Sequence, residues 1–172
     1  MTPGVPLVTK TKSVDDTRLM AAELAPLARA GDIILLSGDL GAGKTAFTQG
    51  FAKGLGVNEP VTSPTFTLVR PYLGRLRLLH ADVYRLDRLQ EVVDLGLVEQ
   101  LDDQAAVACV EWGDLAEPVL PADFLEVRLA YGEAEDERVI RFRSVGPAWA
   151  ARLGALERAM SRWTLGPDGI SA

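Results

Sequence analysis

The sequence contains very few of the residues that crosslink a fold or bind soft metals. Its 172 residues include one cysteine, Cys109, and one histidine, His80. A single cysteine excludes an internal disulfide, and with a single histidine it excludes a zinc site built from several thiolates or imidazoles. No apolar run approaches the roughly 18 residues of a membrane-spanning helix, and residues 1–12 lack the apolar segment of a secretion signal. We therefore expect a cytosolic protein without membrane association.

Positive charge is also in deficit. The chain carries 18 lysines and arginines against 24 aspartates and glutamates, a formal net charge of −6. A protein that binds nucleic acid mainly through phosphates needs a basic face, so we expect no DNA partner and no strong affinity for bare RNA. The content of hydrophobic residues (48%) and charged residues (24%) is typical of a globular chain. The length suits one domain of about 100–200 residues.

Two short apolar segments predict the centre of a sheet. Residues 32–37 and 105–110 are continuous apolar runs bounded by turn residues. Such runs are typical of strands that are buried on both faces of a parallel sheet. Apolar residues recur at helical spacing in residues 13–30, 44–56 and 86–103. Strands that alternate with helices in this way predict an α/β fold.

Other segments predict antiparallel strands around this centre. Residues 7–11 have the length of an edge strand, and residues 65–69 with 76–79 form a first predicted hairpin. Residues 125–130 with 139–142 form a second one, across an acidic turn. We therefore expect a mixed sheet with a parallel core and antiparallel edge strands, flanked by helices.

The C-terminal part of the sequence predicts one more helix. Apolar Leu153, Leu156 and Met160 recur at helical spacing within residues 148–163. We expect residues 1–146 to form the main domain, and residues 147–172 to pack on it or extend from it as a helix and tail.

One motif carries the chemistry. Residues 38–45, GDLGAGKT, match the pattern G-x-x-x-x-G-K-[ST] of a P-loop without a mismatch. Glycines allow the backbone N–H groups to wrap around phosphate oxygens, Lys44 reaches the β- and γ-phosphates, and the Thr45 hydroxyl can bind Mg²⁺. A random chain of this length would contain the pattern on the order of once per hundred sequences. Here a predicted strand precedes it and a predicted helix follows, which indicates a single-domain P-loop NTPase.

The nucleotide follows by elimination. Reading of guanine by common GTPases needs an Asn-Lys-x-Asp sequence, but the only asparagine, Asn58, is followed by Glu59. The GTPase switch aspartate with glycine three positions later is also absent after the loop. We therefore expect ATP.

Three further segments could complete a site for phosphoryl transfer. The hydroxyl-rich residues 62–65 could approach Mg²⁺ or the γ-phosphate, or simply form a capped turn before a strand. Asp82, after a predicted strand, could orient a water or act as a base, or it could cap a helix. Glu111 ends an apolar strand, as a Walker B acid that contacts Mg²⁺ does, but it could also be an edge residue without a ligand.

Several other residues have plainer interpretations. His80 is expected to be a packed, hydrogen-bonded histidine, and Cys109 a small core residue. Trp112 could pack in the core or cover the site, and Arg138 could lean over the nucleotide. The arginines of the first hairpin are expected to form a solvated face; they are Arg70, Arg75 and Arg77.

The combination of motifs resembles the bacterial TsaE family, formerly called YjeE. The P-loop residues 38–45 are followed by Phe47-Thr48 and by residues 54–56, GLG. Then come, in the order of that family, residues 63–69 (SPTFTLV), 80–86 (HADVYRL), 95–97 (LGL) and 111–112 (EW). The resemblance covers about residues 10–145. It is far more specific than the P-loop alone.

The resemblance implies a function in tRNA modification. Family members are small ATPases needed for threonylcarbamoyladenosine formation at position 37 of ANN-decoding tRNAs. They act with the proteins TsaB and TsaD, and TsaD performs the transfer to adenosine. The resemblance thus implies a weak or partner-stimulated, Mg²⁺-dependent ATPase whose contact with tRNA is indirect or weak.

The resemblance also implies roles for individual residues. Thr45 and Glu111 would hold Mg²⁺, while Asp82 and Thr65, with Lys44, would form the hydrolytic site. ATP would be bound by Asp16 and Thr17 near the adenosine, by Arg138, and by the loop residues Asp39, Leu40, Gly41, Ala42, Gly43, Lys44, Thr45 and Ala46.

Two positions depart from the usual pattern of the family. Ala46 stands where a second threonine or serine is usual, which removes one hydroxyl that could contact phosphate. Asp114 stands where a glutamate is frequent, so the acid there is one methylene shorter.

Two alternatives remain open at this stage. A small-molecule P-loop kinase has a similar size, and it would yield a phosphorylated metabolite instead of free phosphate. A nucleotide-gated binding module would use ATP occupancy, not turnover, to switch partner affinity through residues 63–65.

Overall fold

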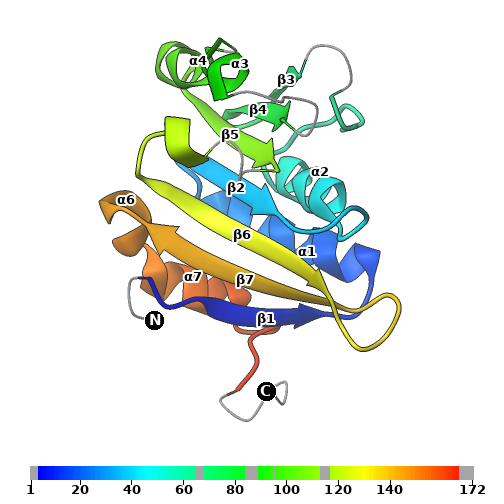
Figure 1. The fold of residues 1–172 in the computed structure, drawn as a ribbon. Coiled ribbons are helices and arrows are strands. Elements are labelled where there is room, and N and C mark those ends of the chain that lie inside the picture. Colours follow the sequence, from blue (N-terminus) through cyan, green and yellow to red (C-terminus); the bar gives the residue numbers. More distant parts are fainter. Residues whose placement is uncertain (1–3, 65–67, 84–88, 95, 113–116, 167–172) are drawn as a thin grey trace.

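A seven-stranded mixed sheet organises the chain (Figure 1). The computed structural model describes residues 4–64, 68–83, 89–94, 96–112 and 117–166. The strand order is β1-β7-β6-β2-β5-β4-β3. The strands are β1 (Leu7–Thr11), β2 (Ile33–Ser37), β3 (Val69–Leu73), β4 (Arg77–Asp82), β5 (Ala106–Glu111), β6 (Phe124–Tyr131) and β7 (Arg138–Val145).

The sheet has the predicted parallel core and antiparallel margins. β2 pairs in parallel with both β5 and β6, and β5 pairs in parallel with β4. β3 is antiparallel to β4 at one margin, while β6, β7 and β1 are antiparallel at the other. Every residue of β2 and β5 is buried, as their continuous apolar runs predict. The prediction of an α/β mixed sheet flanked by helices is confirmed.

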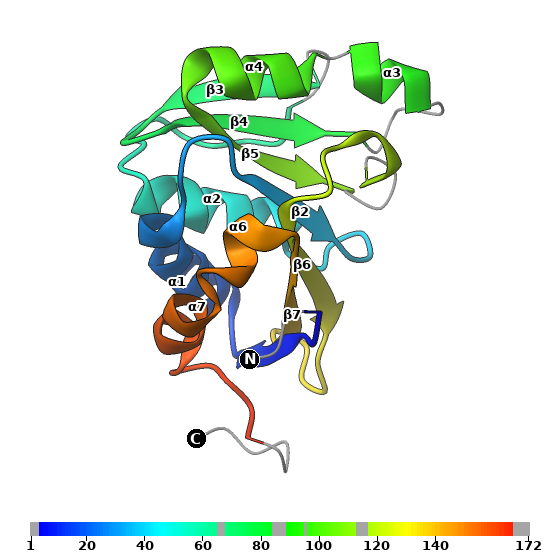
Figure 2. The same cartoon turned by 90° about the vertical axis from the view of Figure 1, so that its left-hand side faces the viewer.

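Helices cover the sheet on both faces. α1, α2, α6 and α7 pack on one face, where Figure 2 shows α1, α2 and α7 together, and α4 packs on the other face over β2 and β5. Among the described residues, no helix is long and apolar enough to cross a membrane. The helices are α1 (Val14–Leu24), η1 (Ala25–Leu27), α2 (Lys44–Gly54), α3 (Leu89–Asp94), α4 (Leu97–Gln104), η2 (Glu117–Val119), α6 (Pro147–Ala150) and α7 (Leu153–Met160).

The pair α1 and α2 forms from local signals in the sequence. The Ser13 hydroxyl accepts a hydrogen bond from the Asp16 N–H at 3.0 Å and caps α1. Pro26 has no N–H, so the helix ends at Leu24 and a short 3₁₀ turn follows, earlier than the predicted end near residue 30. Where α2 crosses α1, a Cβ on Gly50 would collide with the backbone of Arg18, so the close contact needs glycine.

One predicted hairpin is displaced along the sequence. We predicted its first strand at residues 65–69, whereas β3 is Val69–Leu73 and pairs with β4 from Val69 onward. Pro71 lies inside β3 and has no N–H for a ladder. The strand tolerates it because β3 is the edge of the sheet. Residues 65–67 lie outside the described part of the chain.

The predicted C-terminal helix is divided into α6 and α7. Arg152 stands between them with φ −109° and ψ 6°, outside helical geometry. Trp149, Leu156 and Met160 are fully buried in the same core as α1 and α2. The segment therefore shares the hydrophobic core of the sheet.

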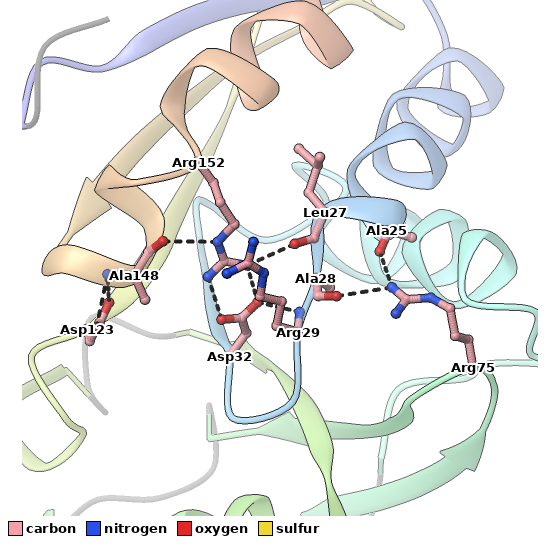
Figure 3. A network of polar contacts seen from close by, with 9 residues as sticks. All are labelled: Ala25, Leu27, Ala28, Arg29, Asp32, Arg75, Asp123, Ala148 and Arg152. Carbon is pink, nitrogen blue, oxygen red and sulfur yellow. Dashed lines mark hydrogen bonds and ion pairs between the residues drawn. The ribbon is translucent and has the colours of Figure 1, made fainter.

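A buried ion pair fixes this segment to the chain before β2 (Figure 3). The Arg152 guanidinium donates to both carboxylate oxygens of Asp32, at 2.6 and 2.7 Å, and to the carbonyls of Leu27 and Ala148. It also lies 4.0 Å from the centre of the Trp149 ring. Asp32 accepts a further bond from the Arg29 N–H at 2.7 Å.

Two of the arginines predicted on a solvated face, Arg70 and Arg75, are exposed as expected, and one of them also has a structural role. Arg75 donates to the carbonyls of Ala25 and Ala28 at 2.8 and 3.1 Å, where η1 ends (Figure 3). The Arg70 guanidinium lies 5.3 Å from the ring centre of Tyr72. The charge pattern of the hairpin did not distinguish the two.

The two ends of the chain meet at the margin of the sheet. The Lys10 N–H donates to the Trp163 carbonyl at 2.9 Å, and the Leu165 N–H donates to the Val8 carbonyl at 3.0 Å. An isolated bridge joins Thr9 and Thr164. Residues 163–165 thus lie along the outer edge of β1.

Candidate functional site

The glycine-rich loop has the backbone geometry that its sequence predicts. It joins the end of β2 to the start of α2, and Gly38, Gly41 and Gly43 have φ angles of 140°, 79° and 108°. Side chains rarely tolerate these values. A Cβ on Gly38 would also collide with the Leu129 carbonyl, so the loop lies directly against β6.

Residues of the β6–β7 hairpin hold this loop in place. The Tyr131 hydroxyl donates to the Leu40 carbonyl at 2.8 Å, and Arg138 Nε donates to the Ala42 carbonyl at 3.1 Å. The Arg138 guanidinium also lies 4.5 Å from the ring centre of Tyr131. Arg138 thus contacts the P-loop backbone, and its direct contact with a nucleotide stays a prediction. Sequence reasoning missed Tyr131, because no motif marks it.

Lys44 folds back over the loop. Its ammonium donates to the carbonyls of Gly38 and Asp39 at 2.7 and 2.9 Å and lies 3.8 Å from the ring centre of Trp112. The whole residue is only 5% exposed. The side chain that the motif assigns to phosphates is therefore held above the loop, with the indole as one wall.

Glu111 receives two hydrogen bonds on one oxygen. Thr45 Oγ1 donates to Glu111 Oε1 at 2.9 Å, and His80 Nε2 lies 3.0 Å from the same atom. Glu111 is 3% exposed and His80 is fully buried. The threonine after the glycine-rich loop and the acid at the end of β5 are thus in contact, and their binding of Mg²⁺ stays a prediction.

Asp82 lies beside Glu111 at the same edge of the sheet, since the two are register partners in the parallel pair β4–β5. Ser63 Oγ donates to Asp82 Oδ2 at 3.0 Å. The predicted hydroxyl-rich segment therefore reaches the carboxylate through Ser63. Thr65, which we predicted in the hydrolytic site, lies outside the described residues.

These groups line one cleft at the carboxyl ends of the parallel strands, where α/β sheets bind ligands. Its volume is about 390 Å³. Ser63 and Trp112, for which the sequence left alternatives open, both line it. Among the described residues, the predicted ones that do not line it are Asp16, Thr17, Asp39, Ala42 and Arg138. The lining residues are Leu40, Gly41, Gly43, Lys44, Thr45, Ala46, Ser63, Asp82, Glu111 and Trp112.

Asp16 and Thr17 have structural contacts at the start of α1. Asp16 accepts bonds from the Lys12 N–H at 2.9 Å and from Trp163 Nε1 at 2.8 Å. Thr17 is buried, and its hydroxyl lies 2.7 Å from that of Thr11. Their contact with adenosine stays a prediction.

The donor atoms suit a magnesium ion that is shared with phosphates. Thr45, Asp82 and Glu111 offer oxygen ligands only, the type that Mg²⁺ prefers. Within the described residues, no group of three or more acidic, histidine or cysteine side chains could hold a metal alone. Burial raises the pKa of the Cys109 thiol, and the nearby Glu111 charge raises it further. Cys109 is fully buried in the apolar core, as expected of a small core residue. Mg²⁺ bound through one or two protein oxygens and phosphate oxygens fits this site.

The fold and the cleft define a class of protein: an α/β protein in which a strand, a glycine-rich loop and a helix face two carboxylates on neighbouring parallel strands. A family model confirms the particular family. The model described as "Threonylcarbamoyl adenosine biosynthesis protein TsaE" matches residues 11–140. The chain belongs to the TsaE family.

Individual relatives are similar over most of their length. A Bacillus subtilis protein named "tRNA threonylcarbamoyladenosine biosynthesis protein TsaE" is 45% identical over 138 residues, which cover 80% of this chain and 85% of the relative. A Streptomyces coelicolor protein of the same name is 45% identical over 140 residues, which cover 77% and 93%. The crystal structure of Bacillus subtilis YdiB superposes with a TM-score of 0.75 at 36% identity, over 90% of this chain and 95% of that one.

Proposed function

We propose that this chain binds ATP with Mg²⁺ in the cleft and hydrolyses it during threonylcarbamoyladenosine formation at position 37 of ANN-decoding tRNAs. One observation carries the proposal: the ammonium of Lys44 and the hydrogen-bonded pair Thr45–Glu111 meet at one end of a glycine-rich loop. A cation, a hydroxyl and a carboxylate in this arrangement suit a nucleotide triphosphate with its metal ion.

Each group has a separate task in the proposed reaction. The loop N–H groups and the start of α2 bind the phosphates, and Lys44 exchanges its carbonyl partners for phosphate oxygens. Thr45 and Glu111 hold Mg²⁺, which offsets negative charge on the phosphates. We assign the orientation of the attacking water to Asp82, whose Oδ2 accepts a hydrogen bond from Ser63 Oγ at 3.0 Å. The resemblance implies Thr65 for the same step.

The proposed partners are proteins. TsaE relatives carry the name of the threonylcarbamoyladenosine pathway, and we propose that this chain acts there with TsaB and TsaD in the cytoplasm. The net charge of −6 supports contact with proteins over strong binding of bare tRNA.

Phosphate release from MgATP tests the proposal. We expect slow release by the protein alone and faster release when TsaB, TsaD and tRNA are added. Lys44→Ala removes a charged hydrogen-bond donor worth about 1.5–3 kcal/mol, so we expect MgATP binding to weaken about 10- to 100-fold in calorimetry. Lys53→Ala, which changes an exposed lysine at the other end of α2, is the matched control. Unchanged affinity in Lys44→Ala would refute the site.

The same assay separates the alternatives. Release without stimulation by partners would remove the pathway assignment, and a phosphorylated small molecule in place of free phosphate would indicate a kinase. Asp82→Asn distinguishes turnover from gating. If that variant binds ATP and partners and still supports full modification, occupancy of the site, not hydrolysis, is the function.

A further inference from the structure

The buried side chain of His80 makes a polar contact with Glu111. Its side chain is fully enclosed on β4, and its Nε2 atom lies 3.0 Å from Glu111 Oε1 on the neighbouring strand β5. We propose that His80 is a positioning residue that holds the Glu111 carboxylate in the orientation needed for Mg²⁺. The inference rests on the proposed function, because it concerns the metal ion of that same site.

The hydrogen-bond inventory fixes the direction of this contact. An ionised carboxylate can only accept, so His80 Nε2 carries the hydrogen. His80 Nδ1 is buried and has no partner among the described residues. A second hydrogen on Nδ1 would be a buried donor without an acceptor. The donor of the imidazole is thus directed to Glu111.

Packing alone does not explain this arrangement. An apolar side chain of similar volume would fill the same space and leave no buried nitrogen unpaired. The imidazole adds one thing that such a residue lacks, a hydrogen bond to the carboxylate. Its position is set by the sheet: His80 is the register partner of Cys109, and Glu111 follows two residues later on the same face of β5.

The consequence concerns the two oxygens of the carboxylate. The bonds from Thr45 and His80 both end on Oε1, and no described residue bonds to Oε2 through a hydrogen bond or ion pair. Two donors on one oxygen fix the carboxylate plane, with Oε2 available for the metal ion or its water. Loss of a supporting bond to a metal ligand usually lowers metal affinity about 10- to 100-fold.

The test compares three substitutions of His80. In His80→Gln the side-chain amide retains an N–H donor close to the Nε2 position. His80→Asn places its amide nearer the Nδ1 position, too short to reach Glu111, and His80→Leu has no donor. Calorimetry with ADP at a series of Mg²⁺ concentrations, and again with EDTA, measures nucleotide affinity without turnover.

We expect the variants to differ in how strongly Mg²⁺ increases their affinity for ADP. His80→Leu and His80→Asn need about tenfold more Mg²⁺ for half-maximal enhancement of ADP binding, while their ADP affinity in EDTA equals that of the unmodified chain. His80→Gln retains the original Mg²⁺ dependence. Thermal unfolding in EDTA shows whether each variant is folded.

Other outcomes overturn the inference. It fails if His80→Leu keeps the original Mg²⁺ dependence, or if His80→Gln loses as much as His80→Leu, since the imidazole shape would then matter and not the donor. An unmodified chain whose ADP binding does not respond to Mg²⁺ would refute the proposed function itself, which is a different result.

Discussion

Two buried carboxylates lie at opposite ends of the parallel strands and differ in whether an arginine or lysine is paired with them. Asp32, before β2, is matched by the Arg152 guanidinium with two hydrogen bonds, and each member has further backbone partners (Figure 3). Glu111, at the end of β5, bonds to a hydroxyl and an imidazole, and no lysine or arginine of the described chain forms an ion pair with it.

The difference separates a structural charge from a functional one. A buried ion pair with all its hydrogen bonds satisfied is balanced, and it fixes one arrangement of the segments that it joins. A buried carboxylate without a cation is costly unless another ion completes it. This difference supports our proposal that a metal ion with its nucleotide completes the charge at the carboxyl end of the sheet, whereas Arg152 already balances Asp32 at the opposite end.

The largest effect is expected where the balanced pair is broken. Arg152→Ala leaves Asp32 as an uncompensated buried charge, which costs about 3–5 kcal/mol of the free energy of unfolding. Urea denaturation without nucleotide measures the loss. Arg158→Ala, on the exposed side of α7, is the matched control and should change stability by less than about 0.5 kcal/mol. A loss below about 1 kcal/mol in Arg152→Ala would show that the Arg152–Asp32 pair does not stabilise the fold.

An intermediate effect is expected at Glu111, and it concerns the Mg²⁺ dependence of ADP affinity and not the free energy of unfolding. Glu111→Gln keeps an oxygen for Thr45 and His80 but removes the charge. The free energy of unfolding without nucleotide should stay within about 1 kcal/mol or rise, because a buried charge has been removed. The Mg²⁺-dependent part of ADP affinity should fall at least about tenfold. A large loss of stability with normal Mg²⁺ dependence would make Glu111 the structural residue.

The smallest effect is expected at a pair that water reaches. The hydrogen bond from Lys10, and next the Glu133 N–H, lower the pKa of Glu137 below its ordinary value. A lowered carboxyl pKa in the folded state adds stability above the ordinary value of about 4.3. That stability disappears as the pH falls through the lower, folded pKa.

We therefore expect the unmodified chain to lose slightly more stability than Lys10→Met between about pH 5 and about pH 3. Denaturation at both pH values measures this difference, and added salt should reduce it by screening. A difference as large as that expected for the Arg152–Asp32 pair would contradict the distinction between partly exposed and buried charges.

Sequence reasoning succeeded where a local pattern has one physical meaning. Continuous apolar runs predicted the central strands, and the P-loop glycines occupy backbone angles that other residues rarely tolerate. The sequence also predicted that Glu111 and Asp82 follow strands of the sheet. The two residues lie at one edge because the carboxyl ends of parallel strands meet there.

It failed where position depends on residues far apart in the chain. The prediction ended this strand at Val69, whereas β3 is Val69–Leu73, and only its place at the edge of the sheet lets it contain Pro71. The bond from Arg152 to Asp32 spans 120 residues, and that from Tyr131 to Leu40 spans 91. A single charged or aromatic residue forms no periodic pattern in the sequence, so such contacts could not be predicted.

The arrangement at β1 has a consequence for the order of folding. In the sheet this strand pairs with β7, about 130 residues later in the chain, and its outer edge is bonded to residues 163–165. During synthesis the parallel core can assemble first, while the backbone groups of Leu7–Thr11 still lack their hydrogen-bond partners. Of the seven strands, β1 is synthesised first but is among the last to gain its partners, because β7 and residues 163–165 must be synthesised before both of its edges are paired.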